Sequence, residues 1–345
     1  MLNASGVFTV VGTASNGREA IAAAQRLRPH VIAMDIHLPI LDGYEATRQI
    51  MQQCPTPIVL ISSPDEAARR SIEALAAGAL AVVAKPRGRV GAAVASEVDD
   101  DQATFLRTLR LMADVRVVTR YPVRALSTGH RSASTDRVAS VVGSRRPAVV
   151  APQVLAIAAS TGGPAAVQLV LRGLDAHFPL PILLVQHITR GFVPALTEWL
   201  HTIVPLPVRI VGQGERLLPG QIYLAPEDHH LTVSAPGVAR LRPLAADDRF
   251  CPSANMLFES VASVYGARAI GLVLTGMGDD GTQGLLALRA AGAFTLAQDA
   301  ASCVVYGMPR AAVEAGAIVR SEALAAIAGT IRELVGDAAR DGGDS

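Results

Sequence analysis

The chain has 345 residues, a formal net charge of +1, 50% hydrophobic residues and 4% aromatic residues. This length is enough for two domains, and the near-zero charge excludes the strongly basic classes that bind nucleic acid or membrane surfaces. No apolar run is long enough to cross a membrane, no signal-peptide pattern opens the chain, and the three scattered cysteines predict no metal site. We therefore expect a cytoplasmic α/β protein with a core of Ala, Val, Leu and Ile.

The first part of the chain, residues 1–114, alternates short apolar runs with helical patterns. This alternation predicts a parallel, doubly wound sheet. The predicted strands are 7–12, 31–34, 57–61 and 81–84, and the predicted helices are 17–27, 43–53, 65–77 and 99–113.

Residues 115–152 lose this periodicity and are rich in Arg, Ser, Thr and Gly, so we expect a flexible linker. Its arginines have no aromatic residues between them, which argues against a nucleic-acid site. Residues 153–336 return to the α/β pattern, and we expect 337–345 to be a disordered tail. Strands are predicted at 154–159, 181–185, 208–211, 221–225, 231–234, 269–275 and 293–297, with the turns 218–220 and 235–237 flanking a β-hairpin.

Polar side chains stand where three successive strands of the first part end: Asp35, Ser62 and Lys85. Because the carboxyl ends of parallel strands meet at one edge, these side chains can converge on one phosphoryl group. The arrangement resembles a response-regulator receiver domain. The resemblance implies that Asp35 accepts a phosphoryl group from a histidine kinase, and that Ser62 and Lys85 sense it.

The resemblance has one departure. A receiver normally begins with a strand that ends in two acidic residues, which hold the Mg²⁺ needed for phosphorylation. The sequence as given begins at what resembles the second strand, and no Asp or Glu precedes Glu19. We expect a receiver-like domain without its first strand and helix, with neighbouring strand edges unpaired. Either the recorded start lies too late, or this receiver does not respond to phosphodonors.

In the second part, an apolar strand runs directly into Ser160, which is followed by Gly162, Gly163 and Pro164. The glycines permit a sharp turn, and the backbone N–H groups at the next helix start can stabilise an oxyanion. His187 and Asp280 also follow strands, so three strand ends supply the parts of an activated serine nucleophile. An N-cap serine in a βα turn is the alternative interpretation.

Two further alternatives stay open in this part of the chain. His229 and His230 are equally available as the base. Residues 276–281 match G-x-G-x-x-G, and Asp299 stands near the position of a ribose-binding acid, which together indicate a dinucleotide fold. Against that interpretation, Asp279 and Asp280 would place two negative charges where a pyrophosphate would lie.

Taken together, the motifs resemble those of the chemotaxis protein-glutamate methylesterases, in which a receiver is joined to an esterase domain. The resemblance implies two doubly wound parallel-sheet α/β domains, an incomplete receiver and a Rossmann-like esterase with a β-hairpin. It implies Ser160 as nucleophile, His187 as base, Asp280 as orienting acid, and the backbone N–H groups of Thr161 and Met277 as oxyanion donors. Asn255 departs from the pattern, because Asp is expected there. The motifs that carry the resemblance are 157–163, 185–188, 224–230, 274–281 and 297–309.

This resemblance implies hydrolysis of glutamate methyl esters on methyl-accepting chemotaxis receptors, with release of methanol, and deamidation of receptor glutamines. The esterase needs no cofactor, and neither nucleic acid nor membrane insertion is expected. In the family, the unphosphorylated receiver is thought to cover the esterase cleft. A phospho-regulated docking module without catalysis is the alternative, and the presence of Ser160, His187 and Asp280 argues against it.

Overall fold

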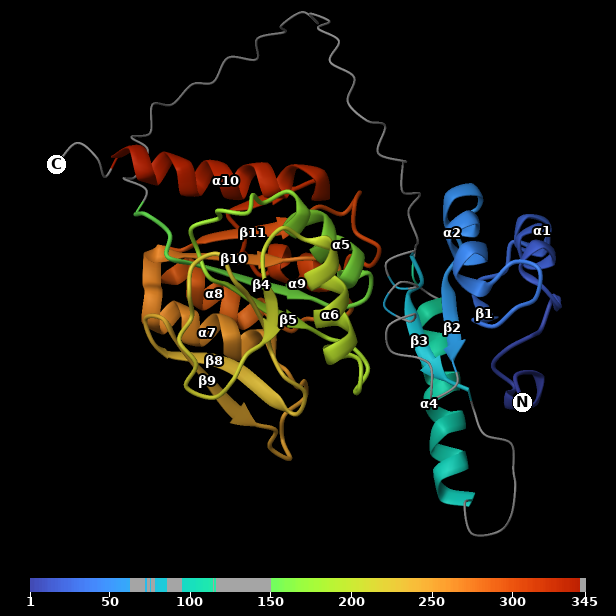
Figure 1. The fold of residues 1–345 in the computed structure, drawn as a ribbon. Helices are drawn as coiled ribbons and strands as arrows, with labels where there is room; N and C mark the ends of the chain where they lie inside the picture. Colours follow the sequence, from blue (N-terminus) through green and yellow to red (C-terminus); the bar gives the residue numbers. More distant parts are fainter. Residues whose placement is uncertain are drawn as a thin grey trace, which may run out of the picture.

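The computed structural model describes residues 1–62, 72, 75, 78–85, 95–113, 115 and 150–341. The described residues form two parallel sheets and one antiparallel hairpin. Figure 1 shows the smaller sheet, from the N-terminal part of the chain, beside the larger one. The expected α/β class is confirmed, because every strand pair in both large sheets is parallel.

The N-terminal sheet has three strands in the order β1-β2-β3. Asp35 is the last residue of β1, Ser62 is the last residue of β2, and Lys85 follows β3. The backbone therefore places these three residues at the same edge of the sheet, as predicted. The elements are α1 (Gly17–Leu27), β1 (Ile32–Asp35), α2 (Gly43–Gln53), β2 (Ile58–Ser62), β3 (Ala81–Ala84) and α4 (Ala95–Ala113).

The strand predicted at residues 7–12 is wrong. This segment is irregular, and Val7, Val10 and Val11 are exposed. A strand requires a neighbour for its backbone groups, and within the described residues the only strand paired with β1 is β2. The predicted helix 65–77 and the predicted linker lie almost entirely outside the described residues.

The larger sheet has seven strands in the order β12-β11-β10-β4-β5-β7-β6. The predicted strands are confirmed, but the edge strand β12 was not predicted, since it has only three residues and two of them are exposed. The bounds are β4 (Val154–Ala159), β5 (Ile182–Gln186), β6 (Val208–Ile210), β7 (Ile222–Leu224), β10 (Ala269–Val273), β11 (Phe294–Gln298) and β12 (Arg320–Glu322).

Helices cover both faces of this sheet, which explains why β4 is apolar along its whole length. Leu155, Ile157 and Ala159 pack in one core with α5, α6 and α10, whereas the alternate residues of β4 pack in a second core with α7, α8 and α9 (Figure 1). The helices are α5 (Gly163–Arg172), α6 (Val193–Ile203), α7 (Ala254–Tyr265), α8 (Thr282–Ala290), α9 (Met308–Glu314) and α10 (Leu324–Asp341).

Helix α10 corrects the expected tail. The helix continues to Asp341, so residues 337–341 are helical, while 342–345 lie outside the described residues. Its N-terminal half is held against the sheet by the buried side chains of Ile327 and Ile331. Backbone hydrogen bonds propagate a helix beyond its packed part at little cost, which a reading of side-chain composition misses.

The predicted hairpin is present as β8 (His229–Ala235) and β9 (Val238–Pro243). The turn at 235–237 joins its two strands, with Gly237 at φ +75°, whereas the turn at 218–220 precedes β7 instead. The hairpin packs on α7, where the Val233 N–H donates to Ser260 Oγ at 3.1 Å.

The order of the strands creates a site at one edge of the larger sheet. From β4 the chain moves outward to β5, and it later returns to pair β10 with the other side of β4. Such a change of direction opens a crevice at the carboxyl ends of the strands, where α/β proteins bind ligands. Ser160 follows β4 directly, and Thr275 follows β10.

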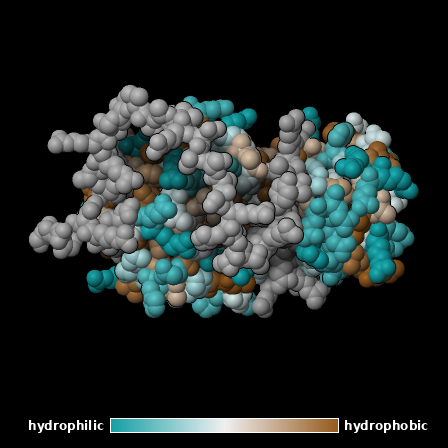
Figure 2. Space-filling model, turned by 90° about the horizontal axis from the view of Figure 1, so that it is seen from above, coloured by the Kyte–Doolittle hydropathy of each residue, from teal (hydrophilic) through white to brown (hydrophobic). Residues whose placement is uncertain are grey.

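Helices α1 and α2 of the N-terminal part have a hydrophilic outer surface. In Figure 2 the region where Figure 1 places α1 and α2 is mostly hydrophilic. In these two helices, Arg18, Gln25 and Arg26 of α1 and Arg48 of α2 are exposed. Among the helices that the structure describes, none combines the length and the apolar composition needed to span a bilayer.

Candidate active site

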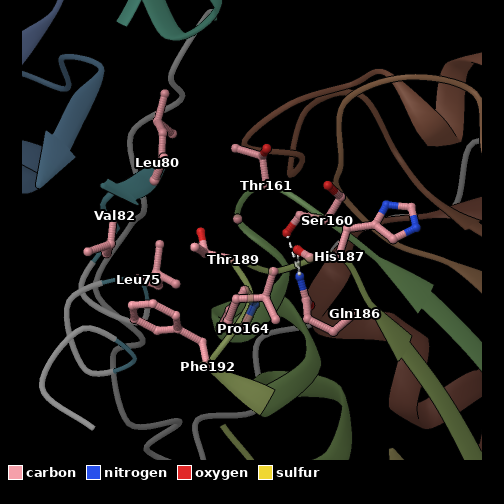
Figure 3. Close-up of a pocket in the computed structure, with 13 residues that line it drawn as sticks. Leu75, Leu80, Val82, Ser160, Thr161, Pro164, Gln186, His187, Thr189 and Phe192 are labelled. Carbon is pink, nitrogen blue, oxygen red and sulfur yellow. Dashed lines mark hydrogen bonds between the residues drawn. The ribbon is translucent and has the colours of Figure 1, made fainter. Parts of the chain in front are cut away.

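The backbone at Ser160 is held from three sides. Its N–H donates to the Thr275 carbonyl at 3.1 Å, and its carbonyl accepts from Gly163 N–H and Gln186 Nε2, each at 2.8 Å. The N-cap of α5 is Gly162, in the left-handed region at φ +75°, so the interpretation of Ser160 as an N-cap is wrong. Ser160 is half-buried and its side chain faces a pocket (Figure 3).

Glycines make this close approach possible. A Cβ on Gly163 would lie 2.2 Å from Gln186 Oε1, and a Cβ on Gly276 would lie 2.7 Å from Ser160 Cβ. These distances are well below van der Waals contact, so a larger residue at either position would displace the turn that presents Ser160. Gly276 follows β10 rather than β4, and its lack of a side chain leaves room for Ser160.

His187 and Asp280 form a close pair, with His187 Nε2 2.9 Å from Asp280 Oδ2. The His187 N–H donates to the Ala159 carbonyl, which fixes the histidine beside the residue before Ser160. The His187 side chain is 16% exposed and that of Asp280 is 1% exposed. The three predicted residues therefore come together at one sheet edge.

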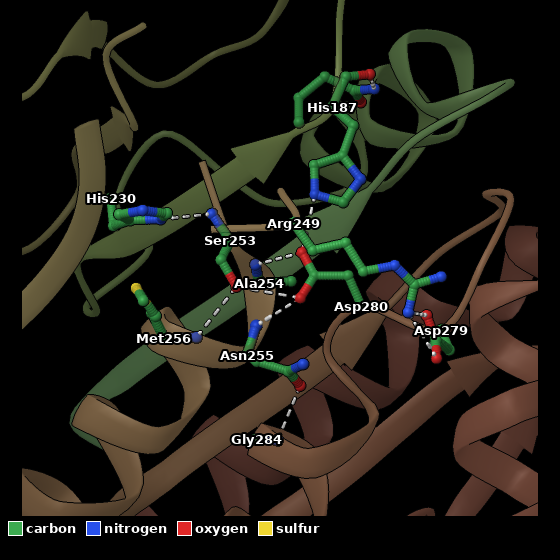
Figure 4. A network of polar contacts seen from close by, with 11 residues as sticks. His187, His230, Arg249, Ser253, Ala254, Asn255, Met256, Asp279, Asp280 and Gly284 are labelled. Carbon is green, nitrogen blue, oxygen red and sulfur yellow. Dashed lines mark hydrogen bonds and ion pairs between the residues drawn. The ribbon is translucent and has the colours of Figure 1, made fainter. Parts of the chain in front are cut away.

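The start of helix α7 binds the Asp280 carboxylate (Figure 4). Oδ2 accepts from Ala254 N–H at 2.7 Å, and Oδ1 accepts from Asn255 N–H at 3.0 Å and from Ser253 Oγ at 3.1 Å. Burial raises the pKa of Asp280, but the His187 hydrogen bond and the two backbone N–H groups outweigh it and hold the pKa below its usual value. Asp280 is therefore a stable anion beside the imidazole.

A second contact fixes the face of the His187 ring. Phe250 stacks on it with the ring centroids 5.3 Å apart and an interplanar angle of 7°. The Arg249 guanidinium lies over the Phe250 ring, 4.9 Å from its centroid, and pairs with Asp279 at 3.2 Å. Contacts therefore run continuously from Asp280 through His187, Phe250 and Arg249 to Asp279. No motif or pattern in the sequence indicated a role for Phe250.

The choice among the histidines is decided by their contacts and by their position relative to the pocket. The His230 side chain is fully buried and bonds to Asp248 and Ser253, and His229 Nδ1 lies 3.1 Å from the Glu227 carbonyl. Neither histidine lines the pocket at Ser160, whereas His187 does. His187 is therefore the histidine placed to act as base.

The pocket has a volume of about 290 Å³ and lies between the two parts of the chain. Ser160, Thr161 and His187 line one side, and Leu75 and Val82 line the other (Figure 3). Next to it, Val304 shares a buried apolar cluster with Leu80, Phe105, Leu109 and Met112 of the N-terminal part.

Of the two expected oxyanion donors, Thr161 follows Ser160 in the chain, and Met277 follows Gly276, which lies close to Ser160. Within the described residues, no hydrogen bond uses the N–H of Thr161 or of Met277. Thr275 ties their loops together, because its hydroxyl lies 3.0 Å from the Thr161 carbonyl and accepts from Val305 N–H at 2.9 Å. Both N–H groups are therefore available to a ligand oxygen.

Comparison with known proteins matches residues 155–331 to the CheB methylesterase family model and residues 1–93 to the response regulator receiver domain model. A protein-glutamate methylesterase/protein-glutamine glutaminase of Myxococcus xanthus is 45% identical over 91% of this chain and 86% of its own. The chain belongs to the CheB methylesterase family.

Two further relatives support this membership. A protein-glutamate methylesterase/protein-glutamine glutaminase of Anaeromyxobacter dehalogenans is 44% identical over 94% of this chain and 92% of its own. The solved CheB methylesterase catalytic domain of Thermotoga maritima is 33% identical, with a TM-score of 0.52, and the match covers 54% of this chain and all of that one. The family resemblance expected from the motifs is thereby confirmed.

Asn255 has a structural role that the sequence did not indicate. Its side-chain Oδ1 accepts from Gly284 N–H at 3.0 Å, while its own N–H donates to Asp280. It therefore links the start of α7, which binds the Asp280 carboxylate, to the start of α8. An amide provides the acceptor for this bond as well as the expected Asp would.

The dinucleotide alternative does not fit the loop at 276–281. Asp280 is turned inward and its two oxygens are occupied by His187 and the start of α7. Asp299 bonds its own turn, accepting from Ser302 N–H at 2.9 Å. Asp280 and Asp299, which resembled cofactor-binding acids, thus form hydrogen bonds within this chain.

In the receiver-like part, Lys85 Nζ lies 3.1 Å from Asp35 Oδ2, so the structure brings these two predicted residues together. The side chain of Ser62 lies outside the described residues. Within the described residues, no three His, Cys, Asp or Glu side chains gather to hold a metal ion. Asp35 Oδ1 accepts from the His37 N–H at 2.9 Å, so each oxygen of this carboxylate has a partner within the chain.

Proposed function

We propose that this chain hydrolyses glutamate methyl esters on chemotaxis receptors, with Ser160 as nucleophile, His187 as base and Asp280 as the acid that orients the base. The observation that carries the proposal is the buried, multiply bonded Asp280 carboxylate against His187, at the strand edge where Ser160 opens into a pocket. A fixed anion stabilises the imidazolium that forms when histidine takes a proton.

In the proposed reaction, Ser160 Oγ attacks the ester carbonyl carbon while its proton passes to His187. Because Asp280 occupies Nε2, the atom of His187 that takes this proton is Nδ1. The carbonyl oxygen becomes an oxyanion, which accepts hydrogen bonds from the N–H groups of Thr161 and Met277. The tetrahedral intermediate then collapses, and His187 returns the proton to the departing methoxide, which leaves as methanol.

The second half of the reaction clears the acyl-enzyme. His187 takes a proton from water, the resulting hydroxide attacks the same carbonyl carbon, and the bond to Ser160 Oγ breaks with return of the proton to the serine. The products are a receptor glutamate and the free enzyme. A glutamine side chain passes through the same steps with ammonia as leaving group, which is the glutaminase activity in the names of the relatives.

The experiment that tests this proposal replaces Ser160 with Ala and measures methanol release from methylated receptor. We expect a loss of about 10⁴–10⁶-fold, because the covalent intermediate cannot form. Ser321→Ala, an exposed serine on β12, is the matched control and is expected to keep full activity. Residual activity above a few per cent in Ser160→Ala contradicts the assignment of the nucleophile.

An assay with a simple activated ester distinguishes catalysis from the alternative, a docking module without catalysis. Hydrolysis by the wild-type chain that is lost in Ser160→Ala supports catalysis. Absence of hydrolysis in the wild-type chain, on receptor and on the simple ester alike, supports the docking module instead.

We further propose that Asp35 is the phosphoryl acceptor and that a histidine kinase is its donor. Support comes from the convergence of Asp35 and Lys85 at the end of their strands and from the match to the receiver model. Leu75, Leu80 and Val82 form the pocket wall opposite Ser160, so this part of the chain limits access of a receptor to the serine. Mutating Asp35 to Ala and measuring phosphate incorporation tests the acceptor.

A further inference from the structure

His230 lies outside the proposed triad but has both ring nitrogens engaged in a fully buried position. Nε2 is 2.9 Å from Asp248 Oδ2, and Nδ1 accepts from the Ser253 N–H at 3.1 Å. A backbone N–H only donates, so Nδ1 carries no proton, and the proton of the neutral ring lies on Nε2 toward Asp248. The environment therefore selects one tautomer.

Ser253 is the residue through which His230 reaches the active site. It is the N-cap of α7, and its hydroxyl lies 3.1 Å from Asp280 Oδ1. The next two backbone N–H groups, those of Ala254 and Asn255, also donate to Asp280. Three consecutive residues thus bind the carboxylate, and His230 fixes the backbone of the first of them (Figure 4).

The other side of the His230 ring is anchored to the hairpin and the loop after it. Asp248 accepts from Ala245 N–H at 2.7 Å, and Arg242, which stands opposite His230 in the hairpin register, is 3.7 Å from Asp248 Oδ1. The backbone N–H of Ala245 lowers the pKa of Asp248, with the bond to His230 adding to the effect. Asp248 is therefore an anion that accepts a hydrogen bond from the Nε2–H group of His230.

We propose that His230 is a positioning residue for the esterase reaction: through Nδ1 it holds the Ser253 N–H, and thereby keeps the start of α7 where it binds Asp280 against His187. The proposal rests on the proposed function of Ser160, His187 and Asp280. A buried polar contact of this kind holds its partner because an N–H left unpaired away from water is unfavourable. The contact with Asp248 orients the ring, and the contact with Ser253 transmits its position.

Two conservative substitutions test the roles of the two His230 ring nitrogens one at a time. The amide of Asn reaches the place of Nδ1, so His230→Asn keeps an acceptor for Ser253 and loses the bond to Asp248. The amide of Gln reaches the place of Nε2, so His230→Gln keeps the bond to Asp248 and loses the acceptor. We expect His230→Gln to lower kcat by about 5- to 100-fold with little change in KM, corresponding to one unpaired buried N–H. His230→Asn is expected to retain several-fold more activity.

The pH profile distinguishes positioning from simple loss of stability. If Asp280 is released, the imidazolium of His187 loses stabilisation, and the acid limb of the kcat/KM profile moves to lower pH in His230→Gln. Among the described residues, Asp280 binds His187 Nε2, Arg249 and Asp279 lie beyond the Phe250 ring, and the Arg190–Asp228 ion pair begins three positions after His187 in the chain. None of these is changed by the substitution.

Thr295→Val is the matched control. Like His230, Thr295 is fully buried; it lies in β11 of the larger sheet, and its hydroxyl bonds to Ala317 and Val319, at 2.7 and 3.1 Å. We expect this variant to lower Tm as the His230 variants do, with the wild-type pH profile.

A measurement that needs no turnover keeps this inference separate from the proposed function. The imidazole protons of His187 are titrated by NMR in Ser160→Ala, with and without His230→Gln. A midpoint that moves to lower pH in the double variant supports the inference even if Ser160 is not the nucleophile. An unchanged midpoint, an unchanged pH profile, or an Asn variant no more active than the Gln variant overturns it.

Discussion

Two histidine–carboxylate pairs lie in the same domain with the same contact distance. His187 and Asp280 are 2.9 Å apart, and so are His230 and Asp248. The first histidine lines a pocket beside a serine and leaves Nδ1 unused by Asp280, whereas the second is fully buried and has both nitrogens bonded. A His–Asp contact is therefore not evidence of catalysis; access and a ring nitrogen available to a substrate are what differ.

The two carboxylates also differ in what binds them. Asp280 is 1% exposed and bound by the start of a helix, where the backbone N–H groups and the helix dipole stabilise an anion. Asp248 is 11% exposed and lies in the loop after the hairpin. In the proposed function the first pair moves protons, whereas the second pair connects the hairpin to α7.

The largest expected effect on this comparison comes from Asp280→Asn. An Asn in this position cannot stabilise the imidazolium, and we expect a loss of esterase activity of about 10³–10⁴-fold. Asp279→Asn is the matched control at the adjacent position. Its exposed ion pair with Arg249 is worth little, so we expect a change of less than about threefold.

Steady-state hydrolysis of methylated receptor by both variants is the measurement. Comparable losses from the two variants, or a larger loss from Asp279→Asn, would mean that the buried carboxylate is not the one that serves His187.

A smaller effect is expected from Phe250→Leu, which removes the ring stacked on His187. His230 is held by burial, whereas the more exposed His187 needs this second contact to fix its ring plane. An aromatic pair contributes about 0.5–1.5 kcal/mol beyond its buried area, which corresponds to a loss of about two- to tenfold in kcat. Phe250→Tyr keeps the stack and is expected to keep the activity. Equal rates in Phe250→Leu and wild type would rule out this role for the ring.

The smallest expected effect is on stability at low pH. The pKa of Asp280 lies below its usual value of 3.8 in the folded chain, because the contacts of the anion outweigh its burial. The stabilisation is present at neutral pH and is lost as the pH falls through the folded-state pKa. The Tm of wild type should therefore exceed that of Asp280→Asn at pH 7, and this difference should shrink on acidification. A difference that stays constant from pH 7 to strongly acidic pH would contradict it.

Much of the fold followed from patterns along the chain. Apolar strands alternating with helices predicted parallel sheets, and in such sheets the residues after the strands meet at one edge. Ser160, His187 and Asp35 each stand directly after or at the end of an apolar strand, so their placement was predictable without any tertiary information.

The failures share one cause, which is that a single segment does not show its neighbours. The apolar run at 7–12 has strand composition, but no described strand lies beside it. The short edge strand β12 has polar, exposed residues and forms because β11 supplies its hydrogen bonds. Strand formation depends on pairing as much as on composition.

By itself, the sequence determined the α/β class, the edge that carries the polar residues and the family, because these depend on local periodicity and on short motifs. The resemblance to the family already implied His187 and Asp280, but only the tertiary structure showed that His187 lines the pocket at Ser160, that Asp280 is buried, and that Phe250 and Asn255 contact them. These features depend on the side chains that distant segments bring within a few ångströms. Asp280 is bound by residues some 25 positions earlier in the chain and by a histidine 93 positions away, and no pattern within one segment records such contacts.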